Sequence, residues 1–212
     1  MIIFNSLKEI KDVSPCAVAL GNFDGVHKGH QELISRTVEK ARAKGLKSAV
    51  FTFSNHPKSF IPGGKEIKNI VYSEEKTFLI EKLGVDYLFS IKFDEEIQNT
   101  EPADFVEKLL VNQFKASEVF CGFNYRFGRK AAGNVDLLRE CGKRLGFSVN
   151  VIEPVVVDGE VVSSTLIRGL IKSGEVDECF KYLGRNYDIG GDVVVGNRLG
   201  KSLGFPTSNI MI

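Results

Sequence analysis

Two histidines follow closely spaced glycines near the start of the chain, in Gly21-Asn22-Phe23-Asp24-Gly25-Val26-His27-Lys28-Gly29-His30. Imidazoles that donate hydrogen bonds can hold a polyphosphate and neutralise the charge that develops during displacement at phosphorus. Gly29 separates the two histidines, and its missing Cβ lets a base or a phosphate approach the backbone closely. The spacing therefore predicts a phosphate site, and a pair of ordinary surface histidines is the alternative.

A strand and a helix must position these histidines. The apolar run 16–20 precedes the glycines, and apolar residues between 33 and 41 follow at the spacing of one helix face. The pattern predicts a strand, a glycine-rich turn and a helix that ends near Gly45. Such a turn presents free backbone N–H groups and the positive end of a helix dipole, which suits a phosphate.

The remainder of the chain alternates between the two kinds of element. Strand-like segments are expected at 47–53, 87–93, 119–122 and 147–157, and helices at 74–83 and 134–145. A further helix is expected with Thr100 as its cap and with Glu101 and Pro102 in its first turn. This alternation predicts an α/β fold of the Rossmann-like class with a mostly parallel sheet.

Ligands of such sheets bind at the carboxyl ends of the strands. His30, His56, Asn124 and Arg126 each follow a predicted strand, so we expect them in a single cleft.

Composition excludes several classes of protein. The 212 residues suffice for one good-sized α/β domain, and 43% hydrophobic with 26% charged residues is typical of a soluble globular protein. A net charge of +1 gives no general footprint for nucleic acid or an acidic membrane. We find no signal peptide and no apolar run of membrane-spanning length, so we expect a cytoplasmic protein. The four cysteines lack metal-site spacing and favour neither zinc nor disulfides.

A second notable segment is Gly122-Phe123-Asn124-Tyr125-Arg126-Phe127-Gly128. Three aromatic residues alternate here with Asn124 and Arg126. These side chains could simply pack a loop. The alternative is a site for an isoalloxazine ring, which takes aromatic faces and a few amide partners, with a cation for its ribityl phosphate.

A third segment, Val162-Ser163-Ser164-Thr165-Leu166-Ile167-Arg168, gathers three hydroxyls. Ser164 could cap a helix that continues to Lys172, which is a purely structural explanation. The same hydroxyls, the helix N-terminal amides and Arg168 also make a second anion cradle.

The stretch 21–30 resembles the N-terminal signature of the bacterial bifunctional riboflavin kinase/FMN adenylyltransferases, or FAD synthetases, within the nucleotidyltransferase superfamily. Residues 162–168 resemble the superfamily's Ile-Ser-Ser-Thr-x-Ile-Arg motif, with Val162 in place of isoleucine. The resemblance implies catalytic roles for His27, His30 and Arg168. It implies ATP binding by Gly21, Phe23, Asp24, Gly29, Ser163, Ser164 and Thr165. Asp24 could instead orient a histidine or cap the turn.

On the flavin side, residues 122–128 resemble the family's Gly-x-Asp/Asn-Phe-x-Phe-Gly motif, with Tyr125 in place of phenylalanine. Residues 52–57 resemble a Thr-Phe-x-Pro-His-Pro segment in which Asn55 replaces a proline. The resemblance implies flavin binding by His56, Phe123, Asn124, Tyr125 and Arg126. A turn histidine fixed by Pro57 explains His56 equally well.

Residues 196–210 contain Gly-Lys-Ser, but Val195 occupies a position where a P-loop needs glycine. The stretch instead resembles the start of a riboflavin kinase domain. The resemblance implies that Thr207 and Asn209 help to hold the Mg²⁺ of the kinase in the full-length protein. We expect a domain at 1–185 and the N-terminal fragment of a kinase β-barrel at 186–212.

One or two strands cannot close a barrel, so residues after about 186 should be disordered or paired with something else.

The resemblance implies transfer of an adenylyl group from ATP to FMN, giving FAD and pyrophosphate, with Mg²⁺ as cofactor. The nucleophile, a phosphate of FMN, is already an anion and needs no general base. Riboflavin phosphorylation is expected only from the full-length protein. Small molecules are the expected partners, with no nucleic acid and no membrane, and the oligomeric state stays open.

Two alternatives remain. A different nucleotidyltransferase of the His-x-Gly-His type would use another phosphate acceptor, and a non-catalytic module would bind flavin nucleotides without turnover. Class I aminoacyl-tRNA synthetases carry a similar His-Ile-Gly-His motif, but Val26 and the absence of a Lys-Met-Ser-Lys-Ser-like loop argue against them.

Overall fold

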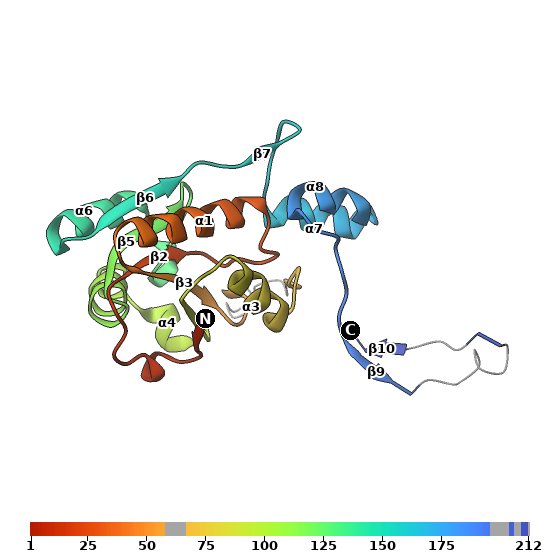
Figure 1. Cartoon of the computed structure of the whole chain (residues 1–212), viewed down its shortest axis with the longest axis horizontal. Helices are drawn as coiled ribbons and strands as arrows, with labels where there is room; N and C mark the ends of the chain where they lie inside the picture. The colour runs from red at the N-terminus through yellow and green to blue at the C-terminus, as the bar shows by residue number, and fades with distance from the viewer. Residues whose placement is uncertain (58–66, 196–203, 206–208, 212) are drawn as a thin grey trace.

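The computed structural model of the chain describes residues 1–57, 67–195, 204–205 and 209–211. Its centre is a six-stranded parallel sheet with the order β1-β4-β3-β2-β5-β6 (Figure 1). The strands are β1 Ile2–Phe4, β2 Cys16–Leu20, β3 Lys47–Phe53, β4 Tyr87–Ile91, β5 Ala116–Gly122 and β6 Ser148–Ile152. The expected α/β class with a mostly parallel sheet is confirmed.

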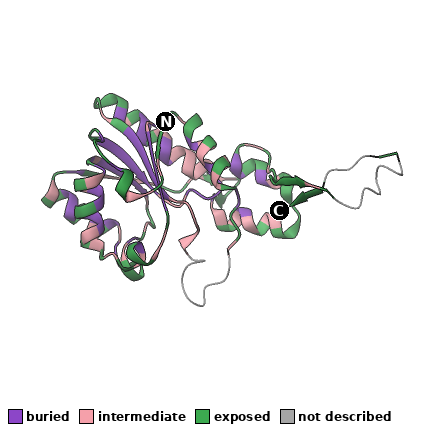
Figure 2. Cartoon of the chain, turned by 90° about the horizontal axis from the view of Figure 1, so that it is seen from below, coloured by how far each residue is buried: buried purple, intermediate pink, exposed green. Residues whose placement is uncertain are grey.

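Helices cover both faces of this sheet. One face packs against α1 Lys28–Ala43 and α3 Ser73–Lys82, and the other against the π-helix η2 Phe105–Gln113 and α6 Val135–Leu145. Figure 2 shows the buried strands between these layers. The other helical elements are η1 Leu7–Glu9, α4 Glu95–Asn99, α5 Pro102–Asp104, η3 Arg129–Ala131, α7 Ser164–Ser173, η4 Val176–Glu178 and α8 Cys179–Leu183.

Strand β2 lies in the middle of the sheet and is buried along its whole length. Cys16, Val18 and Leu20 face the core on the η2 and α6 side, whereas Ala17 and Ala19 face α1. A strand covered on both faces is expected to be continuously apolar, as this one is. From β2 the chain continues to β3 on one side, and β5 lies on the other. This reversal of direction is where open α/β sheets form a ligand crevice at the strand ends.

Two predicted boundaries were wrong. Thr100 does not cap the helix after it, because it ends α4 and its Oγ1 donates to the carbonyl of Glu96 at 2.8 Å. Glu101 precedes α5, which begins at Pro102. The strand expected at 147–157 is divided at Pro154 into β6 and the short β7 Val156–Val157, which pairs with β8 Glu160–Val161. Proline has no N–H to donate to a ladder.

The described residues beyond 186 include β9 Asp192–Val194 and β10 Asn209–Met211, which pair antiparallel with each other away from the α/β body (Figure 1). This segment is therefore not disordered throughout. The rest of that expectation, at 196–203, 206–208 and 212, lies outside the described residues.

All four cysteines are free and buried. Within the described ranges, the structure contains no helix of the length and apolar character needed to cross a membrane.

Replacement of glycine by alanine should have opposite effects on stability at two positions within helices. A Cβ at Gly142 in α6 would lie 2.6 Å from the backbone oxygen of Phe147, whereas a Cβ at Gly169 in α7 would meet nothing within 4 Å. We expect Gly142→Ala to lower the free energy of unfolding by about 1–3 kcal/mol through overpacking. Gly169→Ala should raise it by about 0.5–1 kcal/mol, since alanine restricts the unfolded chain. Urea unfolding of both variants measures these changes, and equal stabilisation would contradict the packing argument.

Candidate active site

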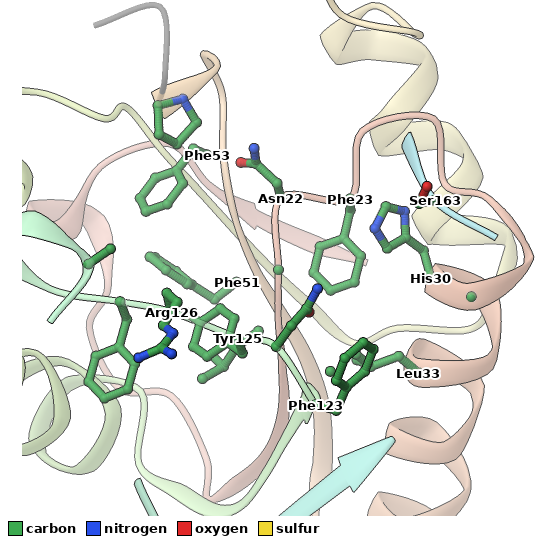
Figure 3. A pocket seen from close by; sticks show the side chains of 18 of the residues that line it. Asn22, Phe23, His30, Leu33, Phe51, Phe53, Phe123, Tyr125, Arg126 and Ser163 are labelled. Atoms are coloured by element: carbon green, nitrogen blue, oxygen red, sulfur yellow. The ribbon is translucent and has the colours of Figure 1, made fainter. Parts of the chain in front are cut away.

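A cavity of about 930 Å³ opens at the carboxyl ends of β2, β3 and β5. Its volume is typical of a small-molecule site. Figure 3 shows Phe23, His30 and Ser163 on one side of it and Tyr125 and Arg126 on the other. The predicted site residues that line it are Gly21, Phe23, His27, Gly29, His30, His56, Phe123, Asn124, Tyr125, Arg126 and Ser163. The four residues expected in one cleft do share it.

The turn between β2 and α1 has a strained backbone. Phe23, Gly25 and Val26 have positive φ angles of 49°, 85° and 39°. Glycine adopts this region freely, but a β-branched residue such as valine does so at a cost of order 1–3 kcal/mol. The surrounding structure must therefore hold the turn in this shape.

Side chains from distant parts of the sequence bind the carbonyls of this turn. The carbonyl oxygens of residues 22, 24, 25 and 26 accept hydrogen bonds from Thr52, Ser164, Arg185 and Gln31, at 3.0, 2.9, 3.0 and 2.8 Å respectively. Gln31 also donates to the carbonyl of Leu183 at 2.8 Å, which joins α1 to the end of α8. The turn is thus fixed by β3, α1, α7 and the segment after α8.

His27 caps the N-terminus of α1. Its Nδ1 accepts a hydrogen bond from the backbone N–H of His30 at 3.3 Å, and the two rings stack with centroids 3.5 Å apart. Because Nδ1 is the acceptor, a neutral His27 carries its proton on Nε2 and is a hydrogen-bond donor there. A Cβ at Gly29 would lie 3.3 Å from the His27 ring, so a small residue is needed for this stacking.

Both imidazoles are neutral at pH 7. Burial lowers the pKa of His27 to about 4, and the charge of Arg168 adds to this effect. Burial also lowers the pKa of His30 well below its usual value, with further contributions from His27 and Lys76. His30 Nδ1 is buried and has no hydrogen-bond partner among the described residues. The pair therefore offers a ligand hydrogen bonds rather than positive charge.

The neutral state of His27 predicts an acid-sensitive fold. The folded protein binds fewer protons than the unfolded chain between pH 6.5 and about 4, so the stability present above pH 6.5 is lost as the pH falls through this window. A shift of this size corresponds to about 3 kcal/mol at most. Urea unfolding at several pH values measures the loss.

A His27→Gln variant provides the control for this pH dependence. It should lose less stability than the parent chain between pH 6.5 and 4, because fewer groups then take up protons on unfolding. Equal losses in the two proteins would show that His27 is not the group responsible.

Asp24 joins the turn to two other segments. This carboxylate is buried; its Oδ1 accepts from the N–H of Ile70 at 2.8 Å and its Oδ2 pairs with Arg168 Nη2. Arg168 Nε donates to the carbonyl of Lys68 at 3.2 Å, and Nη2 lies 3.5 Å from His56 Nε2. Asp24 and Arg168 therefore clamp the turn to α7 and to residues 68–70.

The hydroxyls at the start of α7 have different roles from those expected. Ser163, not Ser164, caps this helix, because its Oγ accepts from the N–H of Leu166 at 3.2 Å. Ser164 instead donates to the carbonyl of Asp24, and Thr165 is exposed. Of the residues predicted for ATP, Asp24, Ser164 and Thr165 do not line the described cavity, and neither does Arg168.

The other wall of the cavity is aromatic. Tyr125 stacks on Phe127 with centroids 5.8 Å apart, and Phe127 packs against Phe105 at 5.2 Å. Phe123 is 53% exposed, and the side chains of Asn124 and Arg126 are exposed beside it. This wall offers aromatic side chains together with an amide and a cation, which suits an aromatic ring that carries a phosphate.

Sequence reasoning missed Lys76 and Arg185. Lys76 is buried on α3, and its Nζ donates to the carbonyl of Phe53 at 2.7 Å. Its neighbours Glu74 and Glu75 give the segment the pattern of a solvated helix face, so spacing carries no signal. Of the predicted kinase metal ligands, Asn209 is exposed on β10 and Thr207 lies outside the described residues.

Comparison with known proteins places this chain in a family. The sequence profile described as FAD synthetase matches residues 9–166, and that of riboflavin kinase matches residues 183–212. The chain belongs to the FAD synthetase family. Two curated relatives are the bifunctional riboflavin kinase/FMN adenylyltransferases of Haemophilus influenzae, 34% identical over 93% of this chain, and Listeria monocytogenes, 36% identical over 92%.

This chain spans 64% and 62% of the length of those two relatives. A solved structure described as a macrolide-efflux protein from Streptococcus pneumoniae is similar with a TM-score of 0.85 and 30% identity, over 99% of this chain and 68% of that one. The family and the fold that the motifs indicated are thereby confirmed.

Proposed function

We propose that this member of the FAD synthetase family transfers the adenylyl group of ATP to FMN, giving FAD and pyrophosphate. The observation that carries the proposal is the shared cavity, in which the stacked His27 and His30 at the N-terminus of α1 face the aromatic segment 123–127. The names and activity of the curated relatives support the choice of reaction.

In the proposed reaction, a phosphate oxygen of FMN attacks the α-phosphorus of ATP. The new P–O bond forms as the bond between the α-phosphorus and the bridging oxygen breaks, and pyrophosphate leaves with both electrons. Catalysis then consists of positioning and charge stabilisation. His27 donates from Nε2, the amides at the start of α1 contribute their N–H groups, and Ser163 lies at the same edge of the cavity.

The flavin would lie against the aromatic wall. Phe123 and Tyr125 would contact the ring, Asn124 would bind its polar edge, and Arg126 would bind the phosphate. His56 lines the cavity beside Arg168, between the two halves of the site. Arg168 holds the turn through Asp24, and its direct contact with phosphate stays a prediction.

Mg²⁺ would enter with ATP. Among the described residues no three His, Cys, Asp or Glu side chains gather into a metal site, and the Asp24 carboxylate is already bound by Ile70 and Arg168. Mg²⁺ in nucleotide sites is commonly held by the substrate phosphates together with few protein ligands. Bound in this way, it would neutralise charge on the leaving pyrophosphate.

For residues 186–212 we propose the start of a riboflavin kinase domain, supported by the family match at 183–212. Phosphorylation of riboflavin would belong to the full-length protein. A division of the chain at 185/186 and a cytoplasmic location are part of the same proposal.

Labelled ATP tests the proposed reaction. The chain is incubated with FMN, Mg²⁺ and ATP labelled at either the α- or the γ-phosphate. We expect the α label in the flavin product and the γ label in pyrophosphate. Appearance of the γ label on an acceptor would overturn adenylyl transfer, and binding of both ligands without any transfer would favour a non-catalytic binding module.

A further inference from the structure

Lys76 is a buried cation at the point where the sheet opens into the site. It lies on α3, its side chain is almost excluded from solvent, and its Nζ donates to the carbonyl of Phe53, the last residue of β3. Phe53 itself lines the cavity, whereas Lys76 does not. Lys76 therefore lies outside the lining of the cavity and is connected to it through Phe53.

The hydrogen bond from Lys76 occupies a vacant position in the sheet. The Gly21 N–H donates to the carbonyl of Phe51 at 3.3 Å. One further rung of a parallel ladder would pair the N–H of Phe23 with the carbonyl of Phe53. The chain instead turns away at Phe23, which has a φ of 49°, and the Lys76 ammonium binds the carbonyl in its place. Lys76 thus joins the end of β3 to the start of the strained turn.

The ammonium is not fully used by this contact. A lysine ammonium has three donors, and the described part of the chain accepts from one of them. Lys76 also makes no ion pair with any described residue, whereas Arg168 pairs with Asp24 and Arg185 pairs with Glu75. Of these three cations, only Lys76 has no carboxylate partner among the described residues.

Two opposing effects act on the pKa of Lys76. Burial lowers the pKa of the Lys76 ammonium, but the nearby Asp24 carboxylate opposes that shift. The positive charge of the same ammonium also lowers the pKa of His30 and so helps to keep this imidazole neutral. Both histidines are neutral. Hydrogen bonds from them and from the backbone amides at the start of α1 therefore do not compensate the charge of a polyphosphate. A buried cation close to these groups would compensate part of that charge, because the dielectric constant is low there.

We propose that Lys76 is the positioning cation of the nucleotide site, which holds the end of β3 beside the turn and whose field stabilises the phosphates of bound ATP. It acts through Phe53 and through its charge, without contact to the reacting atoms. The proposal rests on the proposed binding of ATP in this cavity.

The test compares ligands that differ in phosphate number. Binding of ATP, ADP and adenosine to the chain is measured by calorimetry for Lys76→Met, which keeps the apolar stem, and for Lys76→Gln, which keeps a hydrogen-bond donor. We expect both variants to weaken ATP binding by about tenfold and adenosine binding by less than about twofold, with ADP between them. Lys76→Arg should recover most of the ATP affinity.

Lys82→Met is the matched control, since Lys82 is exposed on the same helix and lies over the ring of Phe78. It should leave all three affinities unchanged. An equal loss of ATP and adenosine affinity in the Lys76 variants would show a merely structural role and overturn the proposal, as would unchanged affinities. If Lys76→Met does not fold, the comparison of ATP and adenosine affinities in Lys76→Gln decides between the two outcomes.

Flavin analysis separates this proposal from the proposed function. A phosphate-dependent loss of affinity without any FAD formation by the parent chain would leave Lys76 in its role and reject adenylyl transfer to FMN. FAD formation by the parent chain, without a phosphate-dependent loss of affinity in the variants, would support adenylyl transfer and reject the role of Lys76.

Discussion

Replacement of His27 with alanine should lower the rate of FAD formation from FMN and ATP by about 100- to 1,000-fold, as expected for loss of a hydrogen-bond donor at developing charge. His27 is buried at the N-terminus of α1, with Nδ1 bound to the N–H of His30 and Nε2 left as a donor. Alanine removes both the cap and the donor. The rate is measured at saturating ATP and FMN by chromatography of the flavins.

His27→Asn separates these two losses. Asparagine is a favourable N-cap, so its side-chain oxygen should accept from the N–H of His30. The variant should therefore keep the contribution of the cap to the free energy of unfolding, about 1 kcal/mol, which the alanine variant loses. Its amide does not reach the position of the His27 Nε2, so the rate should stay low. Activity close to that of the parent chain in either variant would remove His27 from the mechanism.

Replacement of Asp24 with alanine should lower the free energy of unfolding by about 3 kcal/mol, because it leaves the partly buried Arg168 charge without a carboxylate and the N–H of Ile70 without an acceptor. The carboxylate accepts from the N–H of Ile70 and pairs with Arg168, whose side chain is only 21% exposed. The strained turn loses its ion pair to α7, although Ser164 still binds the backbone carbonyl at position 24, so the KM for ATP should rise as well. Urea unfolding and steady-state kinetics measure the two effects.

Asp136→Ala is the matched control for Asp24→Ala. Asp136 pairs with Arg139 at 3.5 Å on the surface of α6, and its side chain is 81% exposed. Exposed pairs contribute little, so we expect a change within about 0.5 kcal/mol. The clamp would be refuted if Asp24→Ala cost no more than Asp136→Ala. A double-mutant cycle with Arg168→Ala measures the coupling directly.

The sequence was sufficient for features that depend on local spacing. The apolar run 16–20, the glycines and the His-x-Gly-His pair lie within one short segment, so strand, turn and helix could be predicted together. The parallel sheet followed from alternation of elements. The aromatic segment 123–127 also stood out, but packing of a loop explained its three rings as well, and only the resemblance to a family motif favoured a flavin site.

The sequence could not show contacts between distant segments. Asp24 and Arg168 are 144 residues apart, and no periodicity marks them as a pair. Ser163 and Ser164 are both good caps by type, and only the geometry at the start of α7 shows which one caps the helix. Lys76 follows two glutamates on a helix and has the pattern of an exposed residue, because sequence gives no information on which carbonyls a fold leaves unpaired.

The most direct test of adenylyl transfer is to incubate the purified chain with ATP, Mg²⁺ and either FMN or riboflavin, and to separate the flavins by chromatography. We expect the chain alone to form FAD from FMN and to form no FMN from riboflavin. If a folded chain that binds both ATP and FMN forms no FAD, the assignment of adenylyl transfer to the cavity between His27, His30 and residues 123–127 is contradicted.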